Sequence, residues 1–307
     1  MDYLHNNREQ FAEAINLAVF QTGLAPEIIE KDYYITLILR KLSEMFDFVV
    51  FKGGTSLSKC HKVIDRFSED IDITIDNSLS QGQKKKLKYG IVEITEEFGM
   101  KISNIDDIRS RRDYNCYRIE YDSVLKSTSG AVNPMVIMET SFTEVSFPTV
   151  TLAVGSYIGK LLQEEAPEML TEYSLNPFEM KVQGLDRTLI DKVFAVCDYY
   201  LSGRVKKHSR HIYDIYKLSP LVRQDDDFRK LIQEVRDVRS KESICLSAQP
   251  DVNVTELLHK IIHDEVYKED YNTLTVRLLK EKVDYNEAIQ ALRKIADSGF
   301  LIRESGK

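Results

Sequence analysis

The first motif with residues suited to chemistry is Phe51-Lys52-Gly53-Gly54-Thr55-Ser56, where an apolar run ends in two glycines and two small hydroxyl residues. Because glycine has no Cβ, the backbone can turn sharply here and bring its N–H groups close to a phosphate. A helix that begins at Thr55 or Ser56 would add free N–H groups and a favourable dipole. The residues predicted to bind a triphosphate are Gly53, Gly54, Thr55 and Ser56.

The second motif is a strand that carries two acids on one face. In Asp70-Ile71-Asp72-Ile73 the acids alternate with isoleucines, as a strand with one apolar face requires. Two carboxylates on one face can share hard cations such as Mg²⁺, and they repel each other without a cation. Each motif alone also fits an ordinary turn or a half-exposed strand, but their order and spacing favour a phosphate and metal site. Asp70 and Asp72 are therefore predicted to bind metal.

A third carboxylate is expected, because two metal ions need more anionic ligands than two acids supply. Glu139 is the candidate, since the apolar run around it makes an unpaired acid costly. A carboxylate that faces solvent or forms a salt bridge at a strand end is an equally good interpretation. Glu120, on the preceding strand-like run, competes for the same role.

The elements that must position these residues form two regions. Helical apolar spacing covers residues 7–44, with a break at Gly23 and Pro26, and a further helix is expected at 91–98. Strand-like runs occupy residues 47–51, 70–76, 101–104, 114–121 and 134–142. From Val182 onward the apolar spacing is helical. The order predicts an α+β fold, a mixed β-sheet with helices on one face followed by a C-terminal helical bundle, with domains at 1–150 and 151–307.

Composition sets broad limits on function. The 307 residues carry a net charge of −7, which argues against a protein that coats nucleic acid non-specifically. Three basic runs lie within this acidic chain, at residues 84–88, 109–112 and 204–210. We expect the first to be a solvated helix face, whereas the third has the best claim to hold an RNA end.

The chain is expected to be cytoplasmic. Its first ten residues are polar, and no stretch approaches the length of a membrane span. The four cysteines are far apart in the sequence, as expected for separate reduced thiols: Cys60, Cys116, Cys197 and Cys245.

In combination these motifs resemble the nucleotidyltransferases of the AbiEii/AbiGii toxin family, which includes the MenT toxins, within the DNA polymerase beta-like superfamily. The resemblance rests on Lys52-Gly53-Gly54-Thr55-Ser56-Leu57-Ser58-Lys59 and Arg66-Phe67-Ser68-Glu69-Asp70-Ile71-Asp72-Ile73. Upstream, Glu30-Lys31-Asp32-Tyr33-Tyr34-Ile35-Thr36 resembles the family's leading helix. Downstream, its lysine and late-aspartate motifs are matched by Arg187-Thr188-Leu189-Ile190-Asp191-Lys192-Val193-Phe194-Ala195 and Arg210-His211-Ile212-Tyr213-Asp214-Ile215-Tyr216. One departure is the gap between Gly54 and Asp70, which is longer than in the most compact members of the superfamily.

The resemblance implies a nucleotidyltransferase-type fold in which the C-terminal domain completes the active site. Lys192 would otherwise be a helix lysine that reaches water, but it matches the family lysine that contacts the nucleotide phosphates. Asp214 would otherwise be a helix-surface acid paired with Arg210, but it matches the late aspartate. Asp214 would either orient the lysine or act on the attacking hydroxyl. The implied catalytic residues are Asp70, Asp72, Lys192 and Asp214, with Asp70, Asp72 and Glu139 as metal ligands.

The reaction implied by the resemblance is transfer of a nucleoside monophosphate from an NTP, with release of pyrophosphate and the help of two Mg²⁺ ions. The implied acceptor is an RNA, the 3′ end of a tRNA. The chain would then be the toxin of a type IV-like toxin–antitoxin or abortive-infection system, controlled by a cognate antitoxin protein. Two alternatives remain: an enzyme that adds a nucleotide such as AMP to a protein, and a non-catalytic protein that binds a nucleotide or a partner.

Overall fold

The chain divides into two compact units. The computed structural model describes residues 2–125 and 133–302. Unit 1 comprises Met1–His61 and Ser68–Val182, and unit 2 comprises Lys62–Phe67 and Gln183–Lys307. The division falls after Val182 rather than after residue 150 as the sequence suggested, because two further strands join the sheet of unit 1.

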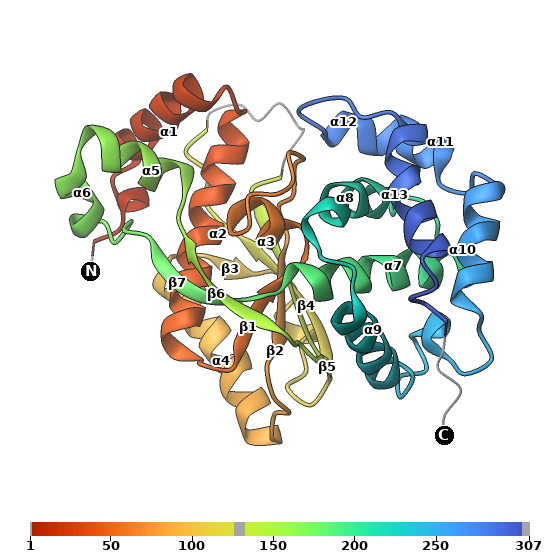
Figure 1. Cartoon of the computed structure of the whole chain (residues 1–307). Helices are drawn as coiled ribbons and strands as arrows, with labels where there is room; N and C mark the ends of the chain where they lie inside the picture. Colours follow the sequence, from red (N-terminus) through yellow and green to blue (C-terminus); the bar gives the residue numbers. More distant parts are fainter. Residues whose placement is uncertain (1, 126–132, 303–307) are drawn as a thin grey trace. The chain divides into compact units, whose positions relative to one another are not determined.

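Unit 1 contains a mixed sheet, which confirms the predicted fold class. Among the described residues, seven strands form it in the order β3-β4-β5-β2-β1-β7-β6 (Figure 1). Strand β2 pairs antiparallel with β1 and parallel with β5, and β1 pairs parallel with β7. The strands are β1 Val49–Lys52, β2 Ile71–Ile75, β3 Lys101–Ile102, β4 Tyr114–Glu120, β5 Met135–Val145, β6 Thr149–Val154 and β7 Phe178–Gln183.

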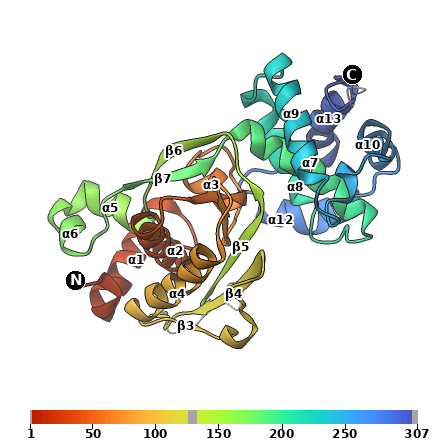
Figure 2. The same cartoon turned by 90° about the horizontal axis from the view of Figure 1, so that it is seen from below.

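Helices α2 and α4 lie together on the concave side of this sheet (Figure 2). Helix α1 ends where Gly23 takes a left-handed conformation, and α2 has Pro26 in its first turn, so the predicted break between them is confirmed. The apolar residues of α2 are buried in the core of unit 1. The helices of unit 1 are α1 Arg8–Thr22, α2 Pro26–Met45, α3 Gly53–Lys59, α4 Gln81–Glu97, α5 Tyr157–Glu165 and α6 Pro167–Glu172, with short 3₁₀ turns η1 Leu4–Asn6 and η2 Ile105–Asp107.

Strands β6 and β7 and the helices between them were not predicted from the sequence. Strand β6 lies at one edge of the sheet, and most of its residues are exposed or half-buried, so it lacks the alternation that marks a strand with one buried face. Strand β7 is held by its parallel pairing with β1, where Phe51 and Val182 are partners. This pairing is a long-range contact, which local spacing does not reveal.

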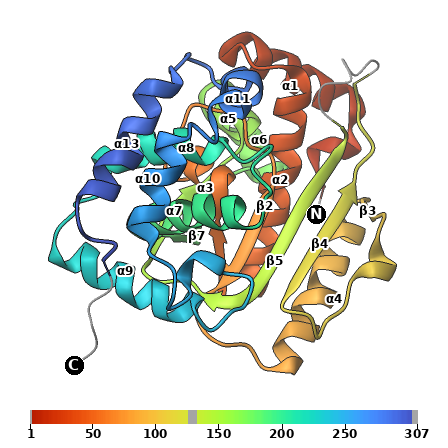
Figure 3. The same cartoon turned by 90° about the vertical axis from the view of Figure 1, so that its right-hand side faces the viewer.

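Unit 2 is a helical bundle, as predicted. Helix α8 packs against α7 and α13, and α13 also packs against α10 (Figure 3). Leu258, Ala288 and Leu292 are fully buried, so the C-terminal part of the chain completes the bundle core. The helices are α7 Leu185–Leu201, α8 Arg210–Leu218, α9 Asp226–Arg239, α10 Val254–His263, α11 Lys268–Asp270, α12 Val276–Leu278 and α13 Tyr285–Asp297. Unit 2 also contains the 3₁₀ turns η3 Ser219–Leu221 and η4 Leu246–Ala248 and the π-helical turn η5 Tyr271–Thr275. Among the described helices, none combines the length and apolar character needed to cross a lipid bilayer.

Candidate active site

The glycine motif and the acid motif meet at the paired ends of β1 and β2. Lys52, the last residue of β1, is the register partner of Asp72 on β2. Gly53 follows with a left-handed backbone (φ 79°), and a Cβ placed on it would lie 1.8 Å from Oδ2 of Asp72. Only glycine allows this backbone to approach the carboxylate so closely. The two motifs that were predicted to form one site are therefore direct neighbours.

The hydroxyl groups of the glycine motif stabilise its own loop. Helix α3 begins at Gly53, two residues earlier than the first predicted start. Ser56 is fully buried and donates a hydrogen bond of 2.9 Å to the carbonyl of Gly53. Thr55 is also buried, and its hydroxyl lies 3.1 Å from that of Ser68. The half-buried backbone of Gly53 and Gly54 is consequently the part best placed to meet a phosphate.

Glu139 lies beside Asp72. The two residues are register partners on the parallel strands β2 and β5, so their side chains leave the same face of neighbouring strands about 4.8 Å apart. Asp70 immediately precedes β2. Glu120 is exposed and pairs with Met135, four residues along β5 from Glu139, or roughly 13 Å at the usual rise of a strand. The register thus favours Glu139 over Glu120 as the third acid, although its role as a ligand stays a prediction.

A tyrosine that the sequence did not single out completes the surroundings of this acid pair. Tyr114 and Cys116 share one face of β4, and Cys116 is the register partner of Glu139. Tyr114 lies diagonally across from Glu139, two residues before its register partner, so the two side chains are within reach of each other. Burial, followed by the nearby Glu139 carboxylate, raises the pKa of Tyr114 above its ordinary value, so the phenol keeps its proton. Burial alternates along β4, and Tyr114 and Cys116 lie on the face opposite its buried one. This alternation is the sequence signal that could have identified them.

The acid pair fits a magnesium ion that is shared with a substrate. The described part of the chain holds no group of three or more His, Cys, Asp or Glu side chains gathered to bind a metal by themselves. Mg²⁺ commonly takes only one or two carboxylates from a protein and completes its shell with waters and phosphate oxygens. Asp72 and Glu139, next to the backbone of Gly53 that is predicted to bind phosphate, supply such a partial donor set.

Helix α2 fixes the segments on both sides of the site. Lys31, whose side chain is 5% exposed, pairs with Glu69 just before the acid strand. Asp32 pairs with Lys59 at the end of α3 and accepts a hydrogen bond of 2.9 Å from the backbone N–H of Tyr157. The leading-helix motif found in the sequence therefore has a structural explanation, because it ties α3 and the start of β2 to one rigid helix.

In unit 2, Lys192 and Asp214 form a buried ion cluster with Arg66. Asp214 is fully buried and accepts hydrogen bonds from Nε and Nη2 of Arg66 at 2.6 and 2.7 Å, and its Oδ2 lies 2.6 Å from Nζ of Lys192. Burial alone would raise the pKa of Asp214, but the two cations hold this pKa well below its usual range. Burial lowers the pKa of Lys192, against the opposing effect of Asp214. This geometry supports the first role considered for Asp214, that of orienting the lysine.

Arg66 lies in one of the motifs that resemble the family, but sequence analysis assigned it no role, because its partner Asp214 is 148 residues away. The segment around it belongs to unit 2. Arg66 forms a β-bridge with Leu279, and the backbone N–H of Phe67 donates to the carbonyl of Leu278 at 2.9 Å. The chain is therefore fastened to the helical unit immediately before Ser68, two residues ahead of Asp70.

His211 adds no further charge to this cluster. Neither of its ring nitrogens has a hydrogen-bond partner within the described chain, and both are inaccessible to solvent. Burial, followed by the nearby Lys192 and Arg210, holds the pKa of His211 well below its ordinary value. A neutral His211 does not compete with Arg66 and Lys192 for the carboxylate of Asp214.

Comparison with known proteins identifies the family of this chain. A family model described as "Nucleotidyl transferase AbiEii toxin, Type IV TA system" matches residues 37–296. The chain belongs to the AbiEii family. Membership of this family makes the protein a nucleotidyltransferase of the toxin–antitoxin type, and it implies an NTP substrate and an antitoxin partner. The predicted acids, Lys192 and Asp214 all lie within the matched residues.

The AbiEii fold is also found in a solved structure. The chain is similar to MenT4, a nucleotidyltransferase toxin from Mycobacterium tuberculosis H37Rv, with 16% sequence identity and a TM-score of 0.50 over 97% of this chain and 90% of the other. At this identity the similarity concerns the fold. No curated protein matches the chain.

We expect Gly53→Ala to slow nucleotide transfer by at least about 100-fold, because the added Cβ must displace the Asp72 carboxylate. Gly99→Ala is the matched control: Gly99 also has a left-handed backbone (φ 65°), but nothing lies within 4 Å of its Cβ position. It should lose only about 1–2 kcal/mol of stability. Transfer rates and urea unfolding of both variants test this, and equal transfer rates would contradict the proposed contact.

Asp214→Asn is expected to destabilise the protein by about 3–5 kcal/mol at pH 7, because it leaves two buried cations without their carboxylate. Asp227→Asn, at an exposed acid paired with Lys230, should leave stability nearly unchanged.

Stability should also depend on pH through Asp214, because its pKa is lower in the folded state than in the unfolded state. The contribution of Asp214 to the free energy of unfolding is fully present above the pKa of the unfolded chain, about 3.9, and declines below it. Urea unfolding at pH 7 and pH 3 measures this, and an effect of Asp214→Asn that does not shrink at pH 3 contradicts it.

Proposed function

We propose that this AbiEii protein transfers a nucleoside monophosphate from an NTP to the 3′ end of an RNA, with tRNA as the expected acceptor, in a Mg²⁺-dependent reaction. The observation that carries the proposal is the close approach of Gly53 to Asp72, together with the register of Asp72 and Glu139. It unites a phosphate-binding backbone with a carboxylate pair, and these are the two parts that nucleotidyl transfer requires.

In this reaction the acceptor hydroxyl loses its proton to solvent, and its oxygen forms a bond to the α-phosphorus. The bond from that phosphorus to the oxygen bridging the α- and β-phosphates breaks, and pyrophosphate leaves. The backbone N–H groups of Gly53 and Gly54 bind the triphosphate. Asp72 and Glu139, with Asp70 beside them, are the residues that would hold two Mg²⁺ ions. Bound Mg²⁺ would lower the pKa of the acceptor hydroxyl and offset charge on the triphosphate.

Lys192 has the role of stabilising the negative charge that develops on the departing pyrophosphate. Its ammonium group is held by Asp214, which is itself held by Arg66. A cation fixed before the substrate arrives needs little reorganisation during the reaction, and this supports the role. Asp214 is then a positioning residue for the lysine rather than the base for the acceptor hydroxyl.

The proposed biological consequence is that nucleotide addition disables the acceptor RNA. The protein would act as the toxin of its type IV system, in the cytoplasm, under the control of a cognate antitoxin. Family membership supports this role.

The test is incubation of the purified protein with Mg²⁺, total tRNA and each α-labelled NTP in turn, followed by separation of RNA from protein. We expect label in the RNA and its loss in Asp72→Ala. Asp76→Ala is the matched control, because Asp76 follows the same strand but pairs with Lys181 and should be dispensable for transfer. Label in protein would favour a protein-modifying enzyme, and bound NTP without any transfer would favour a non-catalytic binding protein.

A further inference from the structure

We propose that residues 109–114 bind the single-stranded end of the acceptor RNA: Arg111 and Arg112 contact backbone phosphates, and the ring of Tyr114 stacks on a base beside Asp72 and Glu139. This inference rests on the proposed function and assigns its acceptor to a surface of unit 1. It differs from the sequence-based expectation, which favoured the basic run at residues 204–210.

Tyr114 joins this surface to the acid pair. It begins β4, two residues before the register partner of Glu139, and side chains in this diagonal relation are within reach of each other. The residue is nevertheless 50% exposed. The ring thus lies beside the acid pair while much of its surface stays open. An aromatic ring exposed in this way is the usual stacking partner for the bases of a single strand.

The loop that precedes Tyr114 is held in shape by a buried side chain. Asn115 is 6% exposed, and its amide accepts a hydrogen bond of 2.9 Å from the N–H of Arg109 and donates one of 3.0 Å to the carbonyl of the same residue. At the end of the loop, the carbonyl of Asp113 accepts a hydrogen bond of 2.8 Å from the N–H of Phe142 on β5. A loop closed in this way needs little further ordering when it binds RNA.

The charges on this loop that have no ion-pair partner among the described residues are positive. The guanidinium of Arg109 donates hydrogen bonds to the backbone carbonyls of Asp106 and Ile108, and Asp113 pairs with Lys84 of α4. Arg111 is exposed and has no hydrogen bond or ion pair within the described chain. Arg112 is exposed and donates only one long hydrogen bond, 3.3 Å, to the carbonyl of Asp107. Although Asp106 and Asp107 offset part of the charge, two guanidinium groups remain able to bind phosphate oxygens.

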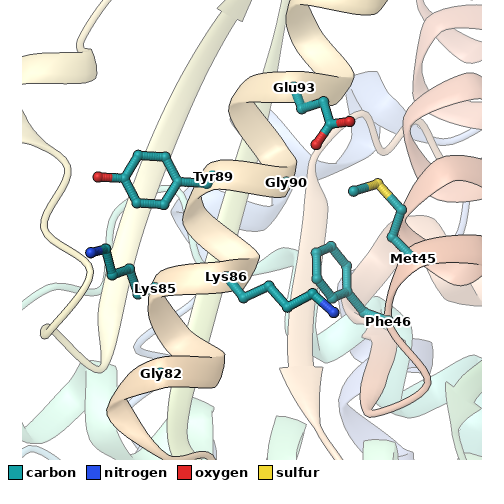
Figure 4. A pocket seen from close by; sticks show the side chains of 8 residues that line it. All are labelled: Met45, Phe46, Gly82, Lys85, Lys86, Tyr89, Gly90 and Glu93. Carbon is teal, nitrogen blue, oxygen red and sulfur yellow. The ribbon is translucent and has the colours of Figure 1, made fainter.

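The other two basic runs lie on different elements. The run at 204–210 belongs to unit 2, and there the Asp270 carboxylate accepts hydrogen bonds from the backbone N–H groups of Lys207 and Ser209. The run at 84–88 belongs to α4, where Lys85 and Lys86 line a hollow of about 360 Å³ with Tyr89 (Figure 4). This hollow is formed by α4 and the end of α2, not by the strands that carry the acids. It provides an internal control, with two exposed lysines and a tyrosine that is 58% exposed.

The first test measures binding of a fluorescent 12-nucleotide single-stranded RNA, without NTP, across a range of salt concentrations. For R111Q/R112Q, we expect a shallower dependence of the association constant on salt. The negative slope of its logarithm against log salt should shrink in magnitude by about 1.4, since each lost phosphate contact removes about 0.7 in a single strand. K85Q/K86Q, the matched control, should keep the wild-type slope. An unchanged slope in R111Q/R112Q, the loss in K85Q/K86Q instead, or no binding by the wild type would overturn the proposal.

The second test separates the tyrosine ring from its hydroxyl. Tyr114→Leu should weaken RNA binding roughly 5- to 150-fold, the usual effect of losing one stacked base, whereas Tyr114→Phe should retain most of the affinity. In the transfer reaction, Tyr114→Leu should raise the KM for RNA and leave the KM for NTP unchanged. A higher KM for NTP with unaltered RNA binding would place the donor base on this ring and overturn the proposal.

Failure of this inference is distinguishable from failure of the proposed function. RNA binding that depends on Arg111, Arg112 and Tyr114, with no nucleotide transfer by the wild type, would reject the function and support the surface. Transfer to RNA that is undiminished in R111Q/R112Q and in Tyr114→Leu would support the function and reject the surface.

Discussion

The arrangement of unit 1 depends on one steric constraint, the absence of space between the backbone of Gly53 and the carboxylate of Asp72. The antiparallel pairing of β1 and β2 ends at this point, so the turn into α3 begins where the acid side chain leaves its strand. A phosphate bound by the glycine backbone and a metal ion bound by Asp72 would share one location. The ion pairs that Lys31 and Asp32 form with Glu69 and Lys59 stabilise this location from α2.

Unit 2 depends on a different interaction, the sharing of one buried carboxylate by two cations. Charges removed from water are tolerated only when they are paired with good geometry, and Asp214 meets this need for both Arg66 and Lys192. The cluster also fastens residues 65–67, which are followed directly in sequence by the segment that leads to Asp70. One ion cluster therefore orients a lysine and anchors the chain that enters the acid strand.

The sequence was sufficient for features that depend on local chemistry. The paired glycines, the alternation of Asp70 and Asp72 with isoleucines, and the break at Gly23 and Pro26 each reflect backbone rules over a few residues. The choice between Glu139 and Glu120 needed the register of β5 against β2, and the partner of Arg66 needed a contact across 148 residues. Strand β6 was missed because its exposed edge position leaves no apolar alternation. The strand register, the partner of Arg66 and the edge position of β6 are tertiary properties, and residue spacing along the chain does not predict them.

The most direct test of the central claim, that Asp72 and Glu139 form the metal site beside Gly53, is binding of Mn²⁺ as a paramagnetic substitute for Mg²⁺ in the presence of a non-transferable NTP analogue. Glu139→Gln should weaken Mn²⁺ binding at least about tenfold, as Asp72→Asn should, because each removes a direct carboxylate ligand. Glu120→Gln, at the exposed acid of the neighbouring strand, should bind as the wild type does. Wild-type affinity in Glu139→Gln, or a loss confined to Glu120→Gln, would contradict the account.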